Sequence, residues 1–466
     1  QVIAFAQAKL GELPVADLPW EYEAHMRSAL LPGIAYVVIG ASRSLITANP
    51  FHIAFLLRLV TALLALVVVR SFVRAVMSEV SDGLQRPFIL LSYFLWFLPY
   101  QHVRFAAETW SGLLFLFGIA QLVGKRESSW NLLLTGLCFG LSIQVKPVMG
   151  IACLGAIAWV LFANKYRRAP LLQLSAGLVT ALAFGFLLDY WFYGACTPTL
   201  WNYRRLAVVG DPSHTFETFP WYYYIPWMMK YGIWPIGVLV VGALVWITYR
   251  QPRTLVVWCV WPYLIVLSAI PHKELRFLFP LVDLAPLVLA LAWQELERST
   301  LFAALRDGHS RQPVVAGAYL LILLNMIALG AAGTTTAGSG RTKLAAALWN
   351  TAPDTIRTLG YTAEEPWIWD IRIPGFYLPP QVEDMGTHDP CAEVHGGTET
   401  IPTDLLIGYA GELSASDCTP LDAGYGIVAR SASEWATELM GFYNDERSGP
   451  YVLYQHDPAP SPPSEP

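Results

Sequence analysis

The stretch of sequence that decides the fold is HIAFLLRLVTALLALVVVRSFVRA, residues 52–75. It is apolar over more than the roughly 20 residues that a helix needs to cross the hydrocarbon core of a bilayer. Arg70 and Arg74 gather at its C-terminal end, a pattern typical of a span that ends at the cytoplasmic surface. Residues 52–75 therefore predict a membrane-spanning helix.

The composition supports this prediction for most of the chain. Of the 466 residues, 55% are hydrophobic and only 14% are charged, against about 25% charged in a typical soluble domain. The mean hydropathy is +0.43. So much apolar surface could not be buried in one aqueous core, so a soluble globular enzyme is excluded and a polytopic membrane protein is indicated.

Apolar runs similar to residues 52–75 recur along the first 333 residues, separated by short polar breaks. We expect about ten spans, although several are shorter than a straight crossing requires. The predicted spans are residues 52–75, 87–100, 106–123, 131–146, 148–164, 170–193, 233–249, 254–271, 275–293 and 314–333.

The basic residues orient these spans, because cytoplasmic loops are enriched in Lys and Arg. Alternate loops carry Arg70, Arg74, Arg86, Lys125, Arg126, Lys165, Arg167, Arg168, Arg250, Arg253, Arg298, Arg306 and Arg311. The opposite side then holds residues 1–50, the loop 193–232, the turn 272–276 and the C-terminal tail. That side is periplasmic or extracellular in a bacterial plasma membrane, or lumenal in the ER membrane of a eukaryote.

Topology also concerns the start of the chain. Residues 1–27 are amphipathic and already lie on the exported side, so we expect a further spanning helix before Gln1.

Charge divides the chain into two parts. Residues 334–466 contain 19 acidic and 6 basic residues, a net charge of −13, whereas the first 333 residues carry +8. We therefore predict a mainly α fold with a transmembrane helical bundle in residues 1–333. A small soluble α+β domain in residues 334–454 and a disordered tail in residues 455–466 follow.

The soluble domain opens with a Gly, Thr and Ser-rich linker near Thr334. Residues 343–359 have helical spacing, and strands are expected at residues 367–373, 405–410 and 425–428. Cys391 and Cys418 are the two cysteines of this domain, among six in the chain. An exported domain permits a disulfide between them, but two free thiols are equally compatible with the sequence.

The sharpest chemical signal is Pro271-His272-Lys273-Glu274-Leu275-Arg276-Phe277. His272, Lys273 and Arg276 lie within five residues at the exported mouth of a predicted span. Such cations suit a phosphate group, since Lys offers a point charge and Arg a two-pronged fork. A helix that began near His272 would add its N-terminal amides. The competing interpretation is interfacial snorkelling of the basic side chains.

A second constellation lies in the N-terminal segment Trp20-Glu21-Tyr22-Glu23-Ala24-His25-Met26-Arg27. Its carboxylates could hold a hydroxylated substrate, and its aromatic rings could stack on one. The same residues would also suit an amphipathic helix that lies among the lipid headgroups. The sequence does not choose between these interpretations.

A third constellation contains Arg104 and Glu108, which are four residues apart and would share one face of a helix. Lys146, at the end of another predicted span, should lie at the same level. Ionisable groups at span ends are candidates for a functional site, although a structural ion pair is the competing interpretation.

A fourth constellation is the aromatic loop of residues 201–227, which holds Arg204, Arg205, His214 and Trp221. Its rings could line a channel for a lipid or a sugar, or they could form an interfacial aromatic belt.

Several motifs are absent from the sequence. It has no Walker loop, no GxGxxG, no HExxH, no paired CxxC, no GxSxG and no DxD. Nucleotide hydrolysis, dinucleotide chemistry and zinc proteolysis are therefore disfavoured. No cofactor is predicted, a divalent metal stays open, and no nucleic acid is expected as a partner.

The order of these elements resembles a known family. The elements are Trp20-Glu21-Tyr22, Arg27-Ser28-Ala29-Leu30-Leu31-Pro32, Asp189-Tyr190-Trp191-Phe192-Tyr193-Gly194, Asn202, Pro220-Trp221-Tyr222-Tyr223-Tyr224 and His272-Lys273-Glu274-Leu275-Arg276-Phe277. Together they are similar to the glycosyltransferase family 22 mannosyltransferases. These are integral-membrane GT-C enzymes of GPI-anchor and N-glycan assembly, with prokaryotic relatives. Glu108 and Lys146-Pro147 match the usual polar motifs of the family poorly.

The resemblance implies an inverting transfer of mannose, or another hexose, from a polyprenyl (dolichyl) phosphate donor. The acceptor would be a lipid-linked or exported glycan on the periplasmic or lumenal face. The family's acidic catalytic motif would precede Gln1, which leaves Glu21 as the best candidate base in this chain. His272, Lys273, Arg276 and Arg204 would bind the donor phosphate. The acceptor or sugar would contact Trp20, Glu23, Arg27, Arg104, Glu108, Lys146, His214 and Trp221.

Two alternatives from other classes stay open. A transporter or flippase for a lipid-linked sugar would also need a basic mouth and an aromatic channel, but the sequence shows no clear internal repeat. A structural subunit would leave the charges of the exported face unexplained.

Overall fold

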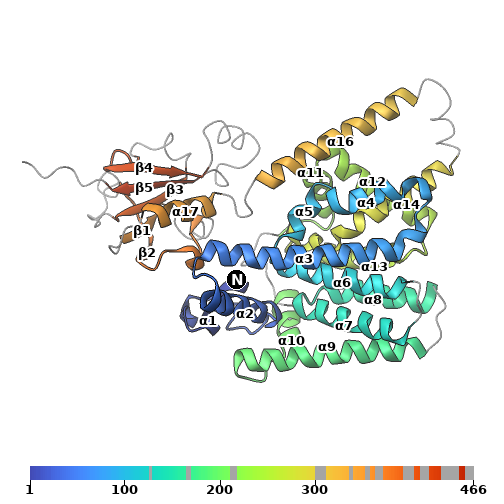
Figure 1. The fold of residues 1–466 in the computed structure, drawn as a ribbon, viewed down its shortest axis with the longest axis horizontal. Helices are drawn as coiled ribbons and strands as arrows, with labels where there is room; N and C mark the ends of the chain where they lie inside the picture. The colour runs from blue at the N-terminus through green and yellow to red at the C-terminus, as the bar shows by residue number, and fades with distance from the viewer. Residues whose placement is uncertain are drawn as a thin grey trace, which may run out of the picture. The chain divides into compact units, whose positions relative to one another are not determined.

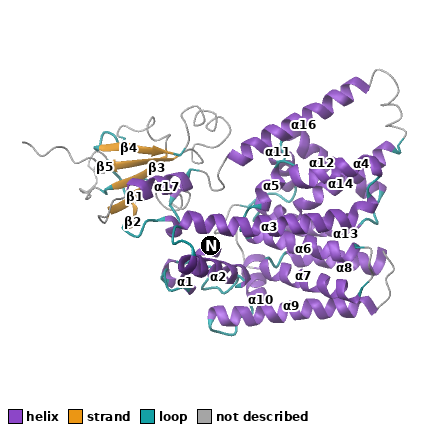
Figure 2. Cartoon of the chain, viewed as in Figure 1, coloured by secondary structure: helices purple, strands orange, loops and turns teal. Residues whose placement is uncertain are grey.

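The computed structural model divides into two compact units, residues 1–333 and 334–466. It describes residues 1–124, 128–163, 169–209, 218–299, 311–334, 340–351, 357–362, 371–391, 403–409, 419–431 and 451–456. Helices form the first unit, and the described strands belong to the second (Figure 2). The mainly α prediction is therefore confirmed.

The first unit is a bundle of helices (Figure 1). Its first half contains α1 Val2–Lys9, η1 Val15–Asp17, α2 Leu30–Leu45, α3 Pro50–Val76, η2 Met77–Glu79, α4 Asp82–Phe94, α5 Phe97–His102, α6 Ala107–Val123, α7 Ser129–Val145, α8 Met149–Ala158, η3 Trp159–Ala163 and α9 Ala169–Tyr193. Its second half contains α10 Thr199–Tyr203, η4 Arg204–Val209, α11 Tyr224–Tyr231, α12 Trp234–Arg250, α13 Leu255–Ala269, η6 Leu275–Leu284, α14 Ala285–Glu297 and α16 Arg311–Thr334.

Small residues let the long helices approach closely. α3, α6, α7 and α9 pack side by side (Figure 1). A Cβ atom on Gly136 of α7 would lie 1.9 Å from the carbonyl oxygen of Leu174 in α9. One on Gly177 of α9 would lie 2.1 Å from that of Leu133 in α7. Glycine at these positions is therefore required for the backbone contact, as is common between helices in membranes.

The number of spans differs from the prediction. A helix is present at each of the ten predicted places. Among the described residues, however, four helices are long and apolar enough to cross a membrane, or five if the α12–α13 pair, bent by 118°, is one span. The described helices α4, α6, α7 and α8 are shorter than the roughly 20 residues of a straight crossing. The chain is thus an integral membrane protein, but ten spans are not confirmed.

The segment from Leu275 to Glu297 consists of η6 and α14. It is the most buried of the four long spans, since 61% of its apolar stretch lies inside the protein. α16 is the least buried, at 6%, and presents apolar side chains outward. The N-terminal part of the bundle includes a helix that the sequence analysis did not predict, α2, which packs against α1 and α3. The η6 helix is therefore held in place by its buried residues, which belong to the core of the bundle.

The second unit is a small sheet with one described α-helix of more than one turn, α17 Arg341–Thr351. The strands are β1 Arg357–Tyr361, β2 Val382–Thr387, β3 Leu405–Tyr409, β4 Tyr425–Arg430 and β5 Tyr451–His456, with η7 Gly375–Tyr377 between β1 and β2. Their order is β2-β1-β3-β5-β4. β1 pairs in parallel with β2 and β3, whereas β5 pairs antiparallel with β3 and β4.

Some local predictions for this unit were wrong. The predicted helix over residues 343–359 stops at Thr351, and Arg357 already belongs to β1, where the buried face of the strand outweighs helical spacing. Residues 371–373 form no strand, and residues 363–370 lie outside the described residues. Strand β5 extends to His456, two residues into the predicted tail. Cys391 is disulfide-bonded, while Cys418, the other cysteine of this domain, lies outside the described residues.

Candidate active site at the mouth of the bundle

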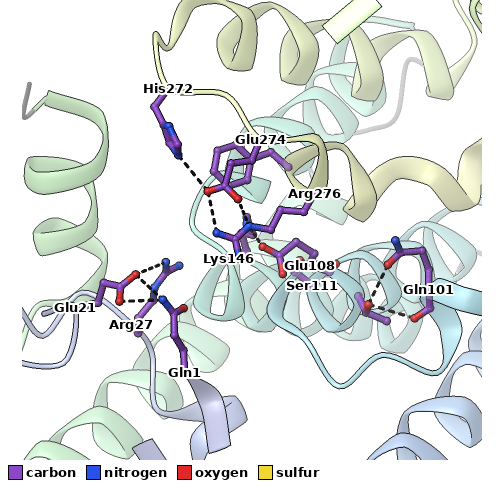
Figure 3. Close-up of polar contacts among 12 residues, drawn as sticks. Gln1, Glu21, Arg27, Gln101, Glu108, Ser111, Lys146, His272, Glu274 and Arg276 are labelled. Atoms are coloured by element: carbon purple, nitrogen blue, oxygen red, sulfur yellow. Dashed lines mark hydrogen bonds and ion pairs between the residues drawn. The ribbon is translucent and has the colours of Figure 1, made fainter. Parts of the chain in front are cut away.

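Six charged residues from four separate parts of the sequence form three acid–base pairs in the first unit (Figure 3). We call these residues the charged cluster: Glu21, Arg27, Glu108, Lys146, Glu274 and Arg276. The pairs also interact with one another, since Arg276 is within electrostatic range of both Glu108 and Glu21. Lys146 in turn lies within range of Arg27 and Arg276. The tertiary fold therefore collects cations and carboxylates at one place.

The innermost pair joins Glu108, in the first turn of α6, to Lys146, which directly follows α7. Lys146 Nζ donates to Glu108 Oε1 at 2.5 Å, and the ammonium lies 4.6 Å from the centre of the Phe277 ring. The Lys146 side chain is only 3% exposed. A buried pair of this kind becomes strongly unfavourable when one partner is removed.

Arg104 and Glu108 do not share a helix face, so that prediction was wrong. α5 ends at His102 and α6 begins at Ala107, which places Arg104 in the break between them. Arg104 donates to the hydroxyl of Tyr100 at 3.1 Å and stacks on the Tyr100 ring instead.

The second pair stands at the start of η6. Glu274 is the N-cap residue of this helix, which begins at Leu275, the first residue of the predicted span 275–293. Glu274 Oε1 accepts from Arg276 Nη2 at 2.8 Å and contacts His272 Nε2 at 3.1 Å. Partial burial opposes ionisation, but the hydrogen bonds and charges of Arg276 and His272 outweigh it and lower the pKa of Glu274. The Arg276 side chain is half exposed, so its guanidinium can still meet a ligand.

The third pair lies in the turn after η1. The buried Glu21 carboxylate accepts from Arg27 Nη2 at 3.1 Å and from Gln1 Nε2 at 3.0 Å. Among the described residues, no hydrogen-bond partner reaches the buried Arg27 Nε. A buried donor without a partner is costly unless a ligand satisfies it.

Tyr203, in the last turn of α10, interacts electrostatically with Arg27, Glu108 and Glu274, so it neighbours all three pairs. Burial raises the pKa of its hydroxyl, which therefore stays protonated and able to donate. Tyr203 could not be recognised as a site residue from the sequence, because nothing local distinguishes it from the other aromatic residues of its loop.

Lys273 is placed differently from the prediction. It is 2% exposed, and its Nζ donates to the carbonyl oxygens of Ile270 at 2.5 Å and Phe219 at 3.1 Å. The same two loops are joined by a β-bridge between Thr218 and His272. Lys273 therefore fastens one loop to the other, and its ammonium is directed at backbone carbonyls.

The other predicted site residues lie outside these three pairs. Arg204 is exposed and its guanidinium lies 5.2 Å from the centre of the Trp201 ring. Trp20 and Glu23 are exposed on the N-terminal turn. Trp221 lines an apolar groove rather than the charged cluster. His214 lies outside the described residues.

Two buried polar groups were missed as functional candidates. Asp189, near the end of α9, is 1% exposed and accepts from Ala29 N at 2.7 Å and Thr199 Oγ1 at 2.6 Å. His102 and Asp283 form a pair at 2.6 Å. A lone Asp in an apolar run is the signal that could have identified both carboxylates.

The described residues include no group of three or more His, Cys, Asp and Glu side chains that could hold a metal ion. The described residues therefore neither support nor oppose a divalent metal.

The fold and the family were compared with known proteins. The fold is similar to that of ArnT from Cupriavidus metallidurans, solved bound to undecaprenyl phosphate, with a TM-score of 0.54, 11% identity, and coverage of 98% of this chain and 93% of that one. At this identity the likeness concerns the fold alone.

Sequence relatives are more specific. GPI mannosyltransferase 3 of Candida albicans is 24% identical over 273 residues, 57% of this chain and 52% of the relative. GPI alpha-1,2-mannosyltransferase 3 of Xenopus laevis is 26% identical over 230 residues, 46% and 42% respectively. The chain thus spans about half the length of these relatives.

The model of the Alg9-like mannosyltransferase family matches residues 14–341. The match contains all six residues of the charged cluster and most of the first unit. It confirms the family resemblance predicted from the sequence motifs. The chain therefore belongs to the Alg9-like mannosyltransferase family.

Proposed function

We propose that this chain is an inverting membrane glycosyltransferase that moves mannose, or another hexose, from a polyprenyl-phosphate donor. The acceptor is a hydroxyl of a lipid-linked or exported glycan, on the periplasmic or lumenal face. The observation that carries the proposal is the charged cluster, which brings Arg27, Lys146 and Arg276 together in a chain of this family.

The proposed reaction is a single displacement at the anomeric carbon. The acceptor oxygen forms a bond to this carbon while the bond to the phosphate oxygen breaks. The lipid phosphate leaves with the electron pair and needs no proton, so the site must stabilise an anion. Arg276 is half exposed, and the buried Arg27 Nε has no hydrogen-bond partner among the described residues. These guanidinium groups are suited to phosphate oxygens.

The reaction also needs a base that removes the acceptor proton. Glu108 is held by the buried Lys146 at 2.5 Å, and Glu274 contacts both Arg276 and His272. Glu21 contacts one cation, Arg27, and the neutral amide of Gln1. Among the cluster carboxylates, Glu21 is neither held by the buried Lys146 nor shared between Arg276 and His272, and we assign it as the base in this chain.

An apolar groove supports a lipid-linked donor. Residues of α11, α12 and α13 surround a groove of about 380 Å³, whose lining includes Tyr224, Met228, Leu244 and Trp261. Tyr224 also interacts with Glu274 of the charged cluster. The groove therefore starts beside the proposed phosphate site, and we assign it to the isoprenoid chain of the donor. The related fold of ArnT, solved with undecaprenyl phosphate, supports this donor class.

The test uses the purified chain in sealed lipid vesicles with radiolabelled polyprenyl-phosphate-mannose and a membrane lipid extract. We expect labelled mannose to enter the extract, and Glu21→Gln to lower kcat by about 100-fold. Glu23→Gln is the matched control, because Glu23 is exposed on the same turn. Equal activity of the two variants contradicts the assignment of Glu21. Movement of intact donor across the membrane without transfer would support a flippase instead.

A second arm tests the groove. A bulky residue at its wall, Ala269→Trp, should raise KM for a long-chain donor several-fold and leave KM for a two-isoprene donor unchanged. Ala183→Trp, at an exposed position of α9, is the control. An equal rise in KM for both donors contradicts the assignment of the groove.

A further inference from the structure

The turn that carries Glu21 and Arg27 contains no regular structure to hold it. Residues 20–25 form successive turns, and His25 has φ +47°, in the left-handed region that residues other than glycine rarely adopt. A backbone in this region persists only when neighbouring groups hold it. The fasteners of this turn therefore decide where Glu21 and Arg27 lie.

Those fasteners come from the end of α9 and from α10. The Tyr193 hydroxyl donates to the carbonyl oxygen of Arg27 at 2.6 Å, and Asn202 Nδ2 donates to that of His25 at 3.3 Å. Asp189 accepts from the backbone N–H of Ala29, two residues after Arg27, at 2.7 Å. The backbone groups that these bonds hold belong to Arg27 itself or to residues two positions away from it.

Asp189 is the centre of this set. Its second oxygen accepts from Thr199 Oγ1 at 2.6 Å, at the start of α10, which also carries Asn202. The carboxylate thus joins α9, α10 and the N-cap residue of α2. It is 1% exposed at the end of an otherwise apolar span. Carboxylates in such places are rare, and they usually serve a function.

The rings of the same segment add a second layer. Tyr193 packs against Tyr22 with 5.4 Å between ring centres and against His25 with 4.7 Å. Lys9 Nζ donates to the carbonyl oxygens of Trp191 and Phe192 at 2.9 Å, which ties α1 to the end of α9. Contacts of α9 therefore surround the turn on its backbone and on its side chains.

We infer that Asp189 and Tyr193 are positioning residues: through the backbone of residues 27–29 they set the place of the Arg27 guanidinium, and hence of the Glu21 carboxylate that it contacts. The inference rests on the proposed function of the charged cluster. Neither residue touches the reacting atoms. Their effect on transfer passes through Arg27.

A double-mutant cycle tests this route. Tyr193→Phe removes one hydroxyl and keeps the ring, so we expect kcat to fall about fivefold, the effect of one hydrogen bond. In an Arg27→Gln background the same change should alter kcat by less than about twofold, because the group being positioned is gone. Tyr190→Phe, exposed on the same helix, is the control and should change neither. An equal fall in both backgrounds overturns the inference, since it would indicate a merely structural role.

A structural measurement keeps the inference independent of activity. In a cryo-EM structure of Asp189→Ala, which leaves Ala29 N and Thr199 Oγ1 without their shared acceptor, we expect the Arg27–Glu21 contact of 3.1 Å to open. The Tyr190→Phe protein should retain the contact. An unchanged contact in Asp189→Ala overturns the inference, whether or not the native chain transfers mannose. If the contact opens in Asp189→Ala but the native chain transfers no mannose, the proposed function fails and the positioning role stands.

Discussion

The two ends of the η6–α14 segment both carry a glutamate that contacts an arginine, but the surroundings of the two pairs differ. At the first end, Glu274 and Arg276 belong to the charged cluster, together with the buried Lys146. At the other end, Glu295 accepts from Arg298 at 2.8 Å and from Gln251 at 2.9 Å, and lies 3.6 Å from Arg250. We call Glu295, Arg298, Gln251 and Arg250 the Glu295 network.

The cations of the Glu295 network face outward. The side chains of Arg298 and Arg250 are 60% and 41% exposed, against 3% for Lys146 in the charged cluster. Exposed pairs contribute about 0–1 kcal/mol, and such arginines serve mainly to anchor span ends at the interface. An ion pair at a span end is therefore suited to a role in chemistry when several segments enclose it and partly remove it from water.

The largest expected effect separates the two arginines. Arg276→Ala should lower kcat/KM for mannosyl transfer by at least about 100-fold, because it removes a cation that we assign to the leaving phosphate. Arg298→Ala should lower it by less than about twofold. Initial rates with labelled polyprenyl-phosphate-mannose measure both, and Arg276→Lys should recover part of the loss. Similar losses in the two alanine variants would break the comparison.

Burial makes the next prediction one of stability. Lys146→Met leaves the Glu108 carboxylate buried and unpaired, so it should destabilise the protein by about 3–5 kcal/mol. Arg250→Met should change stability by less than about 1 kcal/mol, since its partner Glu295 keeps Arg298 and Gln251. Unfolding in detergent by urea measures both. A double variant, Lys146→Met with Glu108→Leu, should regain most of the stability; failure to do so would show that packing, not charge, is responsible.

A smaller effect is expected for Lys273. Its ammonium joins the carbonyls of Ile270 and Phe219, so Lys273→Met should lower the melting temperature and reduce kcat about tenfold through the displaced loop. The exposed Lys230→Met is the control. Complete loss of transfer with an unchanged melting temperature would restore the phosphate-binding role predicted from the sequence.

The smallest effect is a pH dependence. The pKa of Glu274 is lowered in the fold, so its pairing with Arg276 contributes stability that is fully present above its ordinary pKa of about 4.3. This contribution is lost as the pH falls through the lower pKa of the folded state. His272 also contacts Glu274, so both proteins carry His272→Gln, which removes the imidazole. In that background the melting temperature with Glu274 minus that with Glu274→Gln should be constant from pH 6 to 8 and shrink below about pH 4. A difference that grows on acidification contradicts the assigned ionisation.

Much of the bundle follows from local sequence. The apolar runs predicted helices at ten places, and a helix lies at each of them, because hydrophobic periodicity and length are local properties. The number of membrane crossings was harder to predict from the sequence, since α6 and α7 are shorter than a straight span requires. α2 was missed because residues 1–50 were assigned as a whole to the exported side.

For the site, the sequence by itself determined which segments carry charge at span ends, and the motif around His272–Arg276 identified the family. It could not determine which charges meet. Glu108 contacts Lys146, 38 residues away, rather than Arg104, because a helix break intervenes. Lys273 and Arg276 look equivalent in the sequence, yet one ammonium is directed at backbone carbonyls and the other cation stays half exposed. Only the tertiary structure decides these pairings, because the direction of a side chain depends on the packing of segments that are distant along the chain.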